Sequence, residues 1–92
     1  MYQPVYTRQF KKDVRRIEKS GSRDIEKLKA VSKILTEGRQ LFLSYRDHKL
    51  KGDYTGHREC HIEPDWLLVY RINQNEETIT FVRTGSHVDI FE

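Results

Sequence analysis

The segment at residues 66–72, Trp-Leu-Leu-Val-Tyr-Arg-Ile, constrains the fold more than any other part of the sequence. It is apolar on both faces of an extended chain, which predicts a central strand of a sheet. The polar residues at 73–76 supply a hairpin loop, and a second strand follows at residues 78–83. The C-terminal half of the chain is therefore expected to build a sheet around this strand.

Another strand is expected just before the central one. Residues 56–63 alternate with a period of two, as in a strand that has one polar side. One face carries His57, Glu59, His61 and Glu63, and the other carries Arg58, Cys60 and Ile62. Pro64 and Asp65 then make the turn into the central strand.

The N-terminal half has helical periodicity instead. Val5 and Tyr6 predict a short first strand, and Thr7 is a candidate N-cap for the helix that follows. The helix has an apolar stripe at i, i+4 and i+7, which consists of Phe10, Val14 and Ile17. Gly21 is expected to end this helix in a left-handed conformation, which glycine adopts at little steric cost.

A second helix is expected between Ser22, as its N-cap, and Gly38, with Asp24 in the first turn where the helix dipole favours a carboxylate. Its buried side consists of Ile25, Leu28, Val31, Ser32 and Leu35. Two helices joined by so short a turn should form an antiparallel pair. The order of elements is β-α-α-β-β-β, which predicts an antiparallel-rich α+β domain with both helices on one face of the sheet.

Composition limits the class of protein. Ninety-two residues with 36% hydrophobic content fit one domain, residues 1–92, around one core. Cys60 is the only cysteine, so an internal disulfide is excluded. The first twenty residues contain no apolar core for a signal peptide, and no run approaches a membrane span. We therefore expect a cytoplasmic protein with no membrane partner.

The net charge of +3 is unevenly distributed along the chain. Residues 1–46 carry twelve Lys and Arg against five Asp and Glu, whereas residues 47–92 carry five against nine. The density of basic residues is highest at 8–19, where six of twelve are basic and include Lys11, Lys12, Arg15 and Arg16. Such a helix suits a nucleic-acid backbone, although a solvated helix face is the ordinary alternative. The nearby acid/base residues favour nucleic acid.

Candidate proton carriers gather in the acidic half. Internal RNA cleavage needs a base for the ribose 2′-OH, an acid for the leaving 5′-oxygen and a cation near phosphorus. Imidazole can exchange protons near neutral pH, so His48, His61 and His87 suit the first two roles. Asp65 can orient a histidine or act as a base, and Arg83 suits contact with phosphate. Such a reaction needs no metal or other cofactor.

Three separated motifs, in this order of elements, resemble the RelE/ParE superfamily of bacterial toxin-antitoxin toxins and, within it, the YafQ branch. They are Asp-His-Lys-Leu-Lys-Gly at 47–52, His-Ile-Glu-Pro-Asp-Trp at 61–66 followed by Leu-Leu-Val-Tyr, and Arg-Thr-Gly-Ser-His at 83–87 with Phe91 beyond it. The resemblance covers nearly the whole chain. It implies a ribosome-dependent endoribonuclease that enters the vacant A site, cuts the messenger there and is silenced by a cognate antitoxin.

The resemblance also implies a set of site residues. The acid/base group of the family falls on His48, His61, Asp65 and His87, the phosphate-stabilising arginine on Arg83, and the aromatic positions of the site on Trp66 and Phe91. We assign the general acid to His87 and the base to His61 coupled to Asp65, with His48 orienting or sharing the base role. The expected product is a 2′,3′-cyclic phosphate. Lys49 and Lys51 are expected to contact phosphate.

Some positions have more than one interpretation. Trp66 is either a core residue or a platform on which a base stacks. His57 matches no catalytic position of the family and is expected to lie on the surface or in a groove. Val88, Ile90 and Phe91 are expected to return over an edge of the sheet or over the site.

Two other classes of function are kept open. A zinc hydrolase would use His48, His57, His61 and Asp65 as ligands, but their spacing follows no recognised metal-binding pattern. A binding module without catalysis would be a nucleic-acid adaptor or a relative of the gyrase-directed ParE branch, which generally lacks the histidine set.

Overall fold

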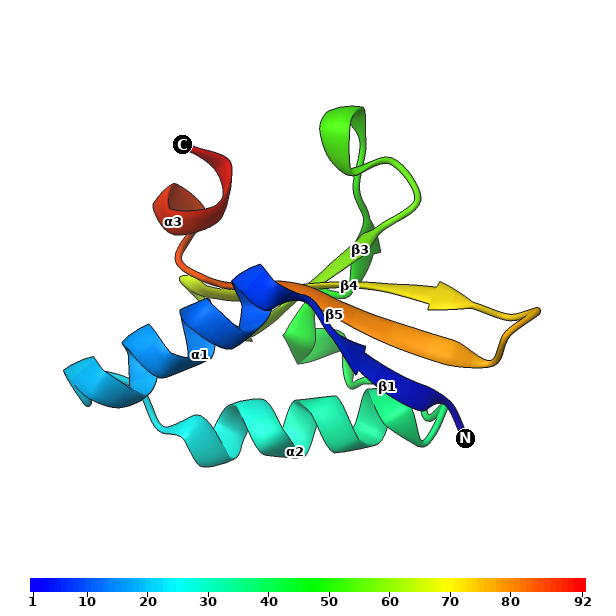
Figure 1. Cartoon of the computed structure of the whole chain (residues 1–92), viewed down its shortest axis with the longest axis horizontal. Coiled ribbons are helices and arrows are strands. Elements are labelled where there is room, and N and C mark those ends of the chain that lie inside the picture. Colours follow the sequence, from blue (N-terminus) through cyan, green and yellow to red (C-terminus); the bar gives the residue numbers. More distant parts are fainter.

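The computed structural model describes all 92 residues and contains a five-stranded sheet in the order β1-β5-β4-β3-β2 (Figure 1). The strands are β1 (Gln3–Tyr6), β2 (His48–Lys49), β3 (Arg58–Glu63), β4 (Trp66–Asn73) and β5 (Thr78–Gly85). β1 pairs with β5 in parallel, and the other three pairs are antiparallel. β4 is the middle strand, which confirms the prediction made from its apolar sequence.

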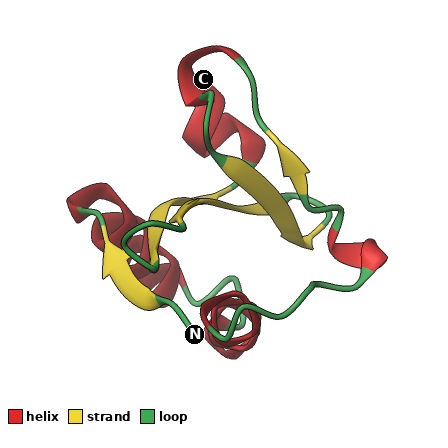
Figure 2. Ribbon diagram, turned by 90° about the vertical axis from the view of Figure 1, so that its right-hand side faces the viewer, coloured by secondary structure: helices red, strands yellow, loops and turns green.

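Helices lie on both sides of this sheet. They are α1 (Arg8–Ser20), α2 (Ile25–Thr36) and α3 (His87–Phe91), with short 3-10 turns η1 (Leu43–Tyr45) and η2 (Gly52–Tyr54). α2 covers one face, whereas α3 and η2 stand over the opposite face (Figures 1 and 2). α1 follows β1 and packs along β5. The predicted α+β class and the two N-terminal helices are confirmed, and the C-terminal residues fold into a third helix over the second face.

The ends of the helices follow simple capping rules, with one difference from the prediction. The Thr7 hydroxyl accepts the Phe10 N–H at 3.0 Å, and Gly21 ends α1 with a φ of 66°. The N-cap of α2 is Asp24, whose carboxylate accepts the Glu26 N–H at 3.0 Å. The prediction of Ser22 as this cap is wrong, because the helix begins at Ile25 and only Asp24 reaches its free N–H groups.

Apolar side chains fill two layers, one on each face of β4. The larger cluster lies on the α2 side and includes Trp66, Leu68 and Tyr70. The smaller one joins Leu67 and Val69 to Ile90 of α3. Alternate residues of one strand thus serve two cores, which explains why β4 is apolar throughout.

Two irregularities in strand pairing determine which residues face α3. The register of β3 and β4 shifts between His61 and Glu63, and Glu63 binds Lys27 of α2 at 2.8 Å instead of lying beside His61. β3 also begins at Arg58, so His57 lies outside the strand. The prediction that Glu63 shares a strand face with Glu59 and His61 is therefore wrong, because alternation holds only within a regular ladder. His57 precedes the strand but lies on the α3 side, where its ring packs on Tyr54.

The second irregularity is in β5. Val69 pairs with Arg83 and Tyr70 with Phe81, which leaves Val82 as the extra residue of a bulge. A bulge changes the direction of nearby side chains, and here it brings Arg83 into register with Val69 on the α3 face. None of the helices combines the length and the apolar character needed to cross a membrane.

Candidate active site

One row of paired residues crosses four strands on the α3 face of the sheet. It runs from His48 through Glu59 and Val69 to Arg83. The next row contains His61, Leu67 and Gly85. Directly paired residues project from the same face, and each strand lies about 4.8 Å from its neighbour, so His48 and Arg83 are roughly 14 Å apart along the row. The fold therefore gathers His48, His61 and Arg83 on one surface.

At one end of this row a carboxylate lies between two imidazoles. The Oε1 atom of Glu59 is 3.4 Å from Nε2 of His48 and 3.4 Å from Nε2 of His61. The Glu59 side chain is only 8% exposed, whereas that of His48 is 49% exposed. The cluster is thus closed on the side of the sheet and open toward solvent at His48.

Backbone carbonyls orient both rings. Nδ1 of His48 lies 2.7 Å from the Arg46 carbonyl oxygen, and Nδ1 of His61 lies 3.2 Å from the Pro64 carbonyl oxygen. A carbonyl oxygen can only accept, so each Nδ1 carries a hydrogen. The Nε2 atoms of the neutral rings are then the lone-pair atoms, and both face Glu59. Two lone pairs and a carboxylate converge on one point, which favours a cation or a proton there.

The short strand that carries His48 is anchored through its neighbour Asp47. The Asp47 carboxylate accepts from the Arg58 guanidinium at 2.9 Å and from the Tyr70 hydroxyl. The hydrogen bond to Asp47 raises the pKa of Arg58. The pKa of the Tyr70 hydroxyl is raised mainly by burial and, second, by its hydrogen bond to Asp47. These contacts fix the position of His48 even though β2 has only two residues.

His87 is the first residue of α3 and lies where β5 ends. Ser86 and Asp89 form a reciprocal capping box, and the Ser86 N–H lowers the pKa of the Asp89 carboxyl. A side chain at Gly85 would come within 2.9 Å of Asp89, so this position requires glycine. The turn therefore presents His87 at the edge of the surface that holds His61, with its ring exposed.

Asp65 contacts α3 rather than the imidazole of His61. Its Oδ1 accepts the backbone N–H of His87 at 3.2 Å. The prediction that Asp65 couples to His61 is wrong, because Nδ1 of His61 is bound to the Pro64 carbonyl and its Nε2 faces Glu59. The carboxylate that faces His61 is that of Glu59. These two residues are two apart on one strand, and this spacing is the feature of the sequence that could have predicted their contact.

The guanidinium of Arg83 already binds a carboxylate of the protein, that of Asp13. Its Nε donates to Asp13 at 2.8 Å, and its Nη2 donates to Asp13 and to the Asp89 carbonyl oxygen, each at 3.2 Å. The hydrogen bond to Asp13 raises the pKa of Arg83. Asp13 is fully buried in α1. Tyr54 also contacts the Arg83 guanidinium and raises its pKa further. The contacts of Nε and Nη2 hold the side chain in place and leave Nη1 turned away from Asp13 and Asp89.

The two predicted aromatic positions differ. Trp66 has no exposed surface, lies in the core on the α2 side and donates to the Thr84 hydroxyl at 3.0 Å. The prediction that its ring contacts RNA is wrong, because a buried ring on the opposite face of the sheet cannot stack on a base. Phe91 lies on the α3 face, with its ring centroid 5.0 Å from that of His87.

A hollow between η2 and α3 adjoins this face. It has a volume of about 550 Å³ and is lined by Lys51, Asp53, Tyr54, Ile90 and Phe91. The Tyr54 and Phe91 rings meet edge to face with centroids 5.5 Å apart. The hollow therefore offers an aromatic wall beside a lysine, a combination that suits a nucleotide. Tyr54 was not predicted from the sequence. Of the two lysines expected to contact phosphate, Lys51 lines this hollow, whereas Lys49 pairs with Arg58 in the row of Tyr70 and so projects from the α2 face.

The basic helix α1 is exposed on its charged side. Lys11, Lys12 and Arg15 form no ion pair, whereas Arg16 lies 3.6 Å from both Asp13 and Asp89. Arg16 thus links α1 to the start of α3 and contributes less free charge than its neighbours. The charged surface of α1 borders the face that carries the histidines.

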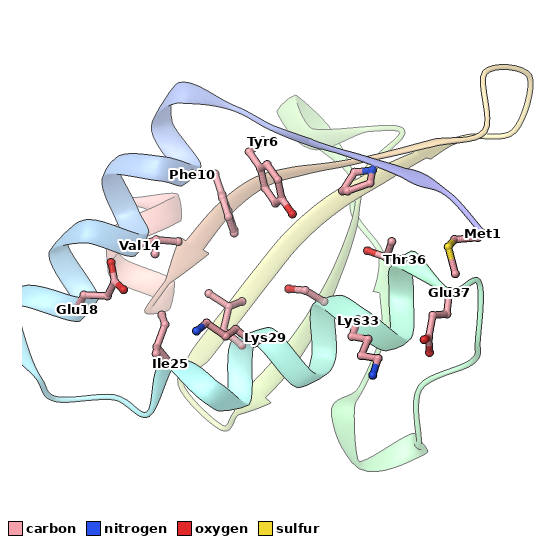
Figure 3. Close-up of a pocket in the computed structure, with 13 residues that line it drawn as sticks. Met1, Tyr6, Phe10, Val14, Glu18, Ile25, Lys29, Lys33, Thr36 and Glu37 are labelled. Carbon is pink, nitrogen blue, oxygen red and sulfur yellow. The ribbon is translucent and has the colours of Figure 1, made fainter.

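An apolar groove lies elsewhere, between α2 and the β1–α1 segment. Its volume is about 460 Å³, and Tyr6, Phe10 and Val14 line one side while Ile25 lies on the other (Figure 3). The groove contains none of the predicted site residues, so the acid/base site does not coincide with it.

Only one group of side chains could hold a metal ion. It consists of His48, Glu59 and His61, whose ligand atoms all lie within 4.8 Å of one another. The zinc set considered from the sequence is wrong in two of its four members, since His57 and Asp65 lie outside this group.

The fold and this face of the sheet define a small α+β toxin of bacterial toxin-antitoxin systems. Residues 2–92 match the family model described as the bacterial toxin of type II toxin-antitoxin system, YafQ. The chain belongs to the YafQ family.

Three similar proteins illustrate the relationship. The mRNA interferase toxin YafQ of Escherichia coli K12 is 37% identical over 87 residues, which cover 94% of this chain and 91% of that protein. The crystal structure of the E. coli DinJ-YafQ complex matches with a TM-score of 0.89 at 34% identity, with 100% of both chains covered. A metal-bound toxin from Helicobacter pylori matches with a TM-score of 0.89 at 38% identity, over 99% of this chain and 100% of that one.

Proposed function

We propose that this toxin is an mRNA interferase, an endoribonuclease that acts in the cytoplasm and cuts messenger RNA in the ribosomal A site. The observation that carries the proposal is the gathering of His48, Glu59, His61 and Arg83 on the face of the sheet where α3 begins. The name of the E. coli relative, an mRNA interferase toxin, supports the same activity.

The proposed reaction is an attack by the ribose 2′-oxygen on the adjacent phosphorus. The cluster takes the 2′ proton through His61, and Glu59 stabilises the imidazolium that forms, while His48 orients the nucleotide or shares the proton. The bond from phosphorus to the 5′-oxygen breaks, and His87 protonates the departing oxygen. The products are a 2′,3′-cyclic phosphate and a free 5′-hydroxyl. His61 gains one proton and His87 loses one, so both proton transfers are supplied by this chain and the step itself needs no metal.

The spacing of the two proton carriers suits this geometry. His61 and Gly85 belong to one row and are two strands apart, roughly 10 Å along the sheet, and His87 follows Gly85 by two residues. A base and an acid on opposite sides of a phosphodiester need such a gap between them. Leu67 lies between them and provides an apolar floor.

Charge on the phosphate is balanced from two directions. Nη1 of Arg83, which binds neither Asp13 nor Asp89, can donate to a phosphate oxygen. Lys51, which is exposed, adds positive charge to the hollow that Phe91 lines. Asp65 acts on α3, where it holds the backbone N–H of His87 and so positions the acid.

Two partners follow from the proposal. The exposed lysines and arginines of α1 would dock on ribosomal RNA, because long-range attraction to phosphates depends on uncompensated charge. A cognate antitoxin would silence the toxin, and the similar E. coli protein is found in a DinJ-YafQ toxin-antitoxin complex.

Cleavage of messenger by purified toxin on translating ribosomes tests the proposal. Replacing His61 or His87 with Gln should lower the cleavage rate by at least about 100-fold, the usual contribution of a general base or acid. His57→Gln is the matched control, because His57 lies outside the cluster and its ring contacts Tyr54 and the Thr55 carbonyl oxygen instead. Fragments should end in a 2′,3′-cyclic phosphate.

Three results would refute it. One is full cleavage by the His61 and His87 variants, and another is a 3′-hydroxyl end on the upstream fragment. The third is growth arrest by gyrase inhibition without any cleavage, which would favour the non-catalytic alternative.

A further inference from the structure

The cluster of His48, Glu59 and His61 has the composition of a transition-metal site. Two imidazole nitrogens and one carboxylate are ligands that Zn²⁺ accepts, and three protein ligands are the usual number in zinc sites that keep an open position. Both Nε2 atoms are the lone-pair atoms of their rings, and both face the same oxygen of Glu59. We propose that these three residues bind a Zn²⁺ ion, and that bound zinc inhibits the toxin.

The distances within the cluster match a tetrahedral ion. Ligand atoms about 2.1 Å from a tetrahedral zinc lie roughly 3.4 Å from one another. The two distances from Glu59 Oε1 to the imidazole Nε2 atoms are each 3.4 Å. The three atoms together lie within 4.8 Å, so only the separation between the rings needs to adjust. His48, the more exposed ring, has the freedom to make that adjustment.

Neighbouring groups orient the ligands as they do in established metal sites. Histidine ligands usually donate the hydrogen of their other ring nitrogen to a carbonyl or a carboxylate, which fixes the tautomer. Here the Arg46 and Pro64 carbonyl oxygens receive Nδ1 of His48 and His61. Glu59 is held on β3 and is nearly buried. The ligands are therefore preorganised, and the cost of ordering them on binding is small.

The remaining candidate ligands are excluded by their positions. Cys60 follows Glu59 in the strand but lies in the core on the α2 side. His57 packs against Tyr54, and Asp65 accepts the backbone N–H of His87. The fourth position around the ion would be open to water, because the His48 side of the cluster is exposed.

The inhibitory part of the inference rests on the proposed function. A zinc ion on Nε2 of both histidines occupies the lone pairs that would take the proton of the 2′-OH. It also neutralises Glu59, which would otherwise stabilise an imidazolium. Zinc binding and RNA cleavage are thus predicted to exclude each other.

Calorimetric titration of the untagged protein with ZnCl₂ tests the site without reference to activity. One ion per chain should bind to the unaltered protein. The variants Glu59→Gln, His48→Gln and His61→Gln should each bind at least about 10-fold more weakly, since even a change outside the ligand set commonly costs that much. His57→Gln is the matched control and should bind like the unaltered chain. Equal binding by all four variants, or weaker binding only by His57→Gln, would overturn the site.

A second measurement tests inhibition. The protein is loaded with zinc, freed of excess ion by gel filtration and added to translating ribosomes. The cleavage rate should fall at least about 10-fold relative to metal-free toxin, and a zinc-selective chelator that spares Mg²⁺ should restore it. Undiminished cleavage by the loaded toxin would overturn the inhibitory role, as would loss of cleavage on chelation. Inactive metal-free toxin would contradict the proposed function instead, while the titration would still decide whether the site exists.

Discussion

The Nε of Arg83 donates to the fully buried carboxylate of Asp13 at 2.8 Å, across seventy residues of sequence. Asp13 also accepts the backbone N–H of Thr84 at 3.1 Å, on a part of β5 that has no neighbouring strand on that side. One carboxylate therefore joins α1 to the unpaired stretch of β5 and holds the arginine that we assign to phosphate. This contact makes the site depend on the packing of α1.

Replacing Asp13 with Ala should destabilise the fold by about 3–5 kcal/mol, because the change leaves the Arg83 charge and the Thr84 N–H without their partner. Urea unfolding followed by circular dichroism measures this difference. Combining Asp13→Leu with Arg83→Met should cost less than the sum of the two single changes, since the two residues interact directly. Additive effects would contradict a direct contact.

Trp66 and Phe91 should respond to mutation in opposite ways. Trp66→Phe removes the donor to Thr84 and leaves a gap in the core, so it should cost roughly 1–3 kcal/mol of stability with little effect on the cleavage rate of folded protein. Phe91→Leu should lower cleavage and leave the core intact, because Phe91 lines the hollow beside His87. Thermal unfolding and ribosome assays on both variants separate these effects. A large loss of cleavage by folded Trp66→Phe would restore the stacking hypothesis.

Cys60 should be chemically inert in the folded protein. Burial, followed by the charges of Asp47 and Glu59, raises the pKa of its thiol, so the thiol stays protonated at neutral pH. Reaction with a disulfide reagent should be at least about 1,000-fold slower in buffer than in urea, because it requires an opening reaction of several kcal/mol. Rapid reaction in buffer would show that β3 opens locally.

Asp89 should make the start of α3 sensitive to acid. The Ser86 N–H lowers the pKa of this carboxyl below its ordinary value of 3.8. A lowered pKa in the folded state means that the ionised group stabilises the fold above pH 3.8 and that this contribution is lost as the pH falls through the folded pKa. The melting temperature of Asp89→Asn should therefore lie below that of the unaltered chain at pH 6, and the gap should narrow toward pH 3. A gap that does not change with pH would exclude this linkage.

The basic surface of α1 should govern ribosome binding. Replacing Lys11, Lys12 and Arg15 with Gln should weaken association and reduce the slope of log affinity against log salt by about 1 for each phosphate that the helix no longer binds. Arg16 is left unchanged because it also binds Asp89. The matched control removes three charges from α2 and the segment after it with Lys29→Gln, Lys33→Gln and Arg39→Gln. Equal losses of ribosome affinity in both variants would show that net charge alone, and not the position of α1, governs binding.

The sequence alone determined the elements whose signals are local. The apolar run of β4, the stripe of Phe10 and Ile17 and the glycine at the end of α1 each specify their own conformation, so the α+β class followed from them. The motifs at 47–52, 61–66 and 83–87 likewise identified the family. None of these inferences required a knowledge of which side chains meet in space.

Only the tertiary structure decided the contacts within the site. Strand register placed Glu59, and not Asp65, between the two histidines, and a bulge in β5 brought Arg83 into register with Val69. The face of the sheet that Trp66 occupies, and the pairing of Asp13 with Arg83, also depended on how distant segments pack. A shift of one residue in pairing moves every side chain of a strand to the opposite face, and such shifts are set by long-range hydrogen bonding that periodicity does not record.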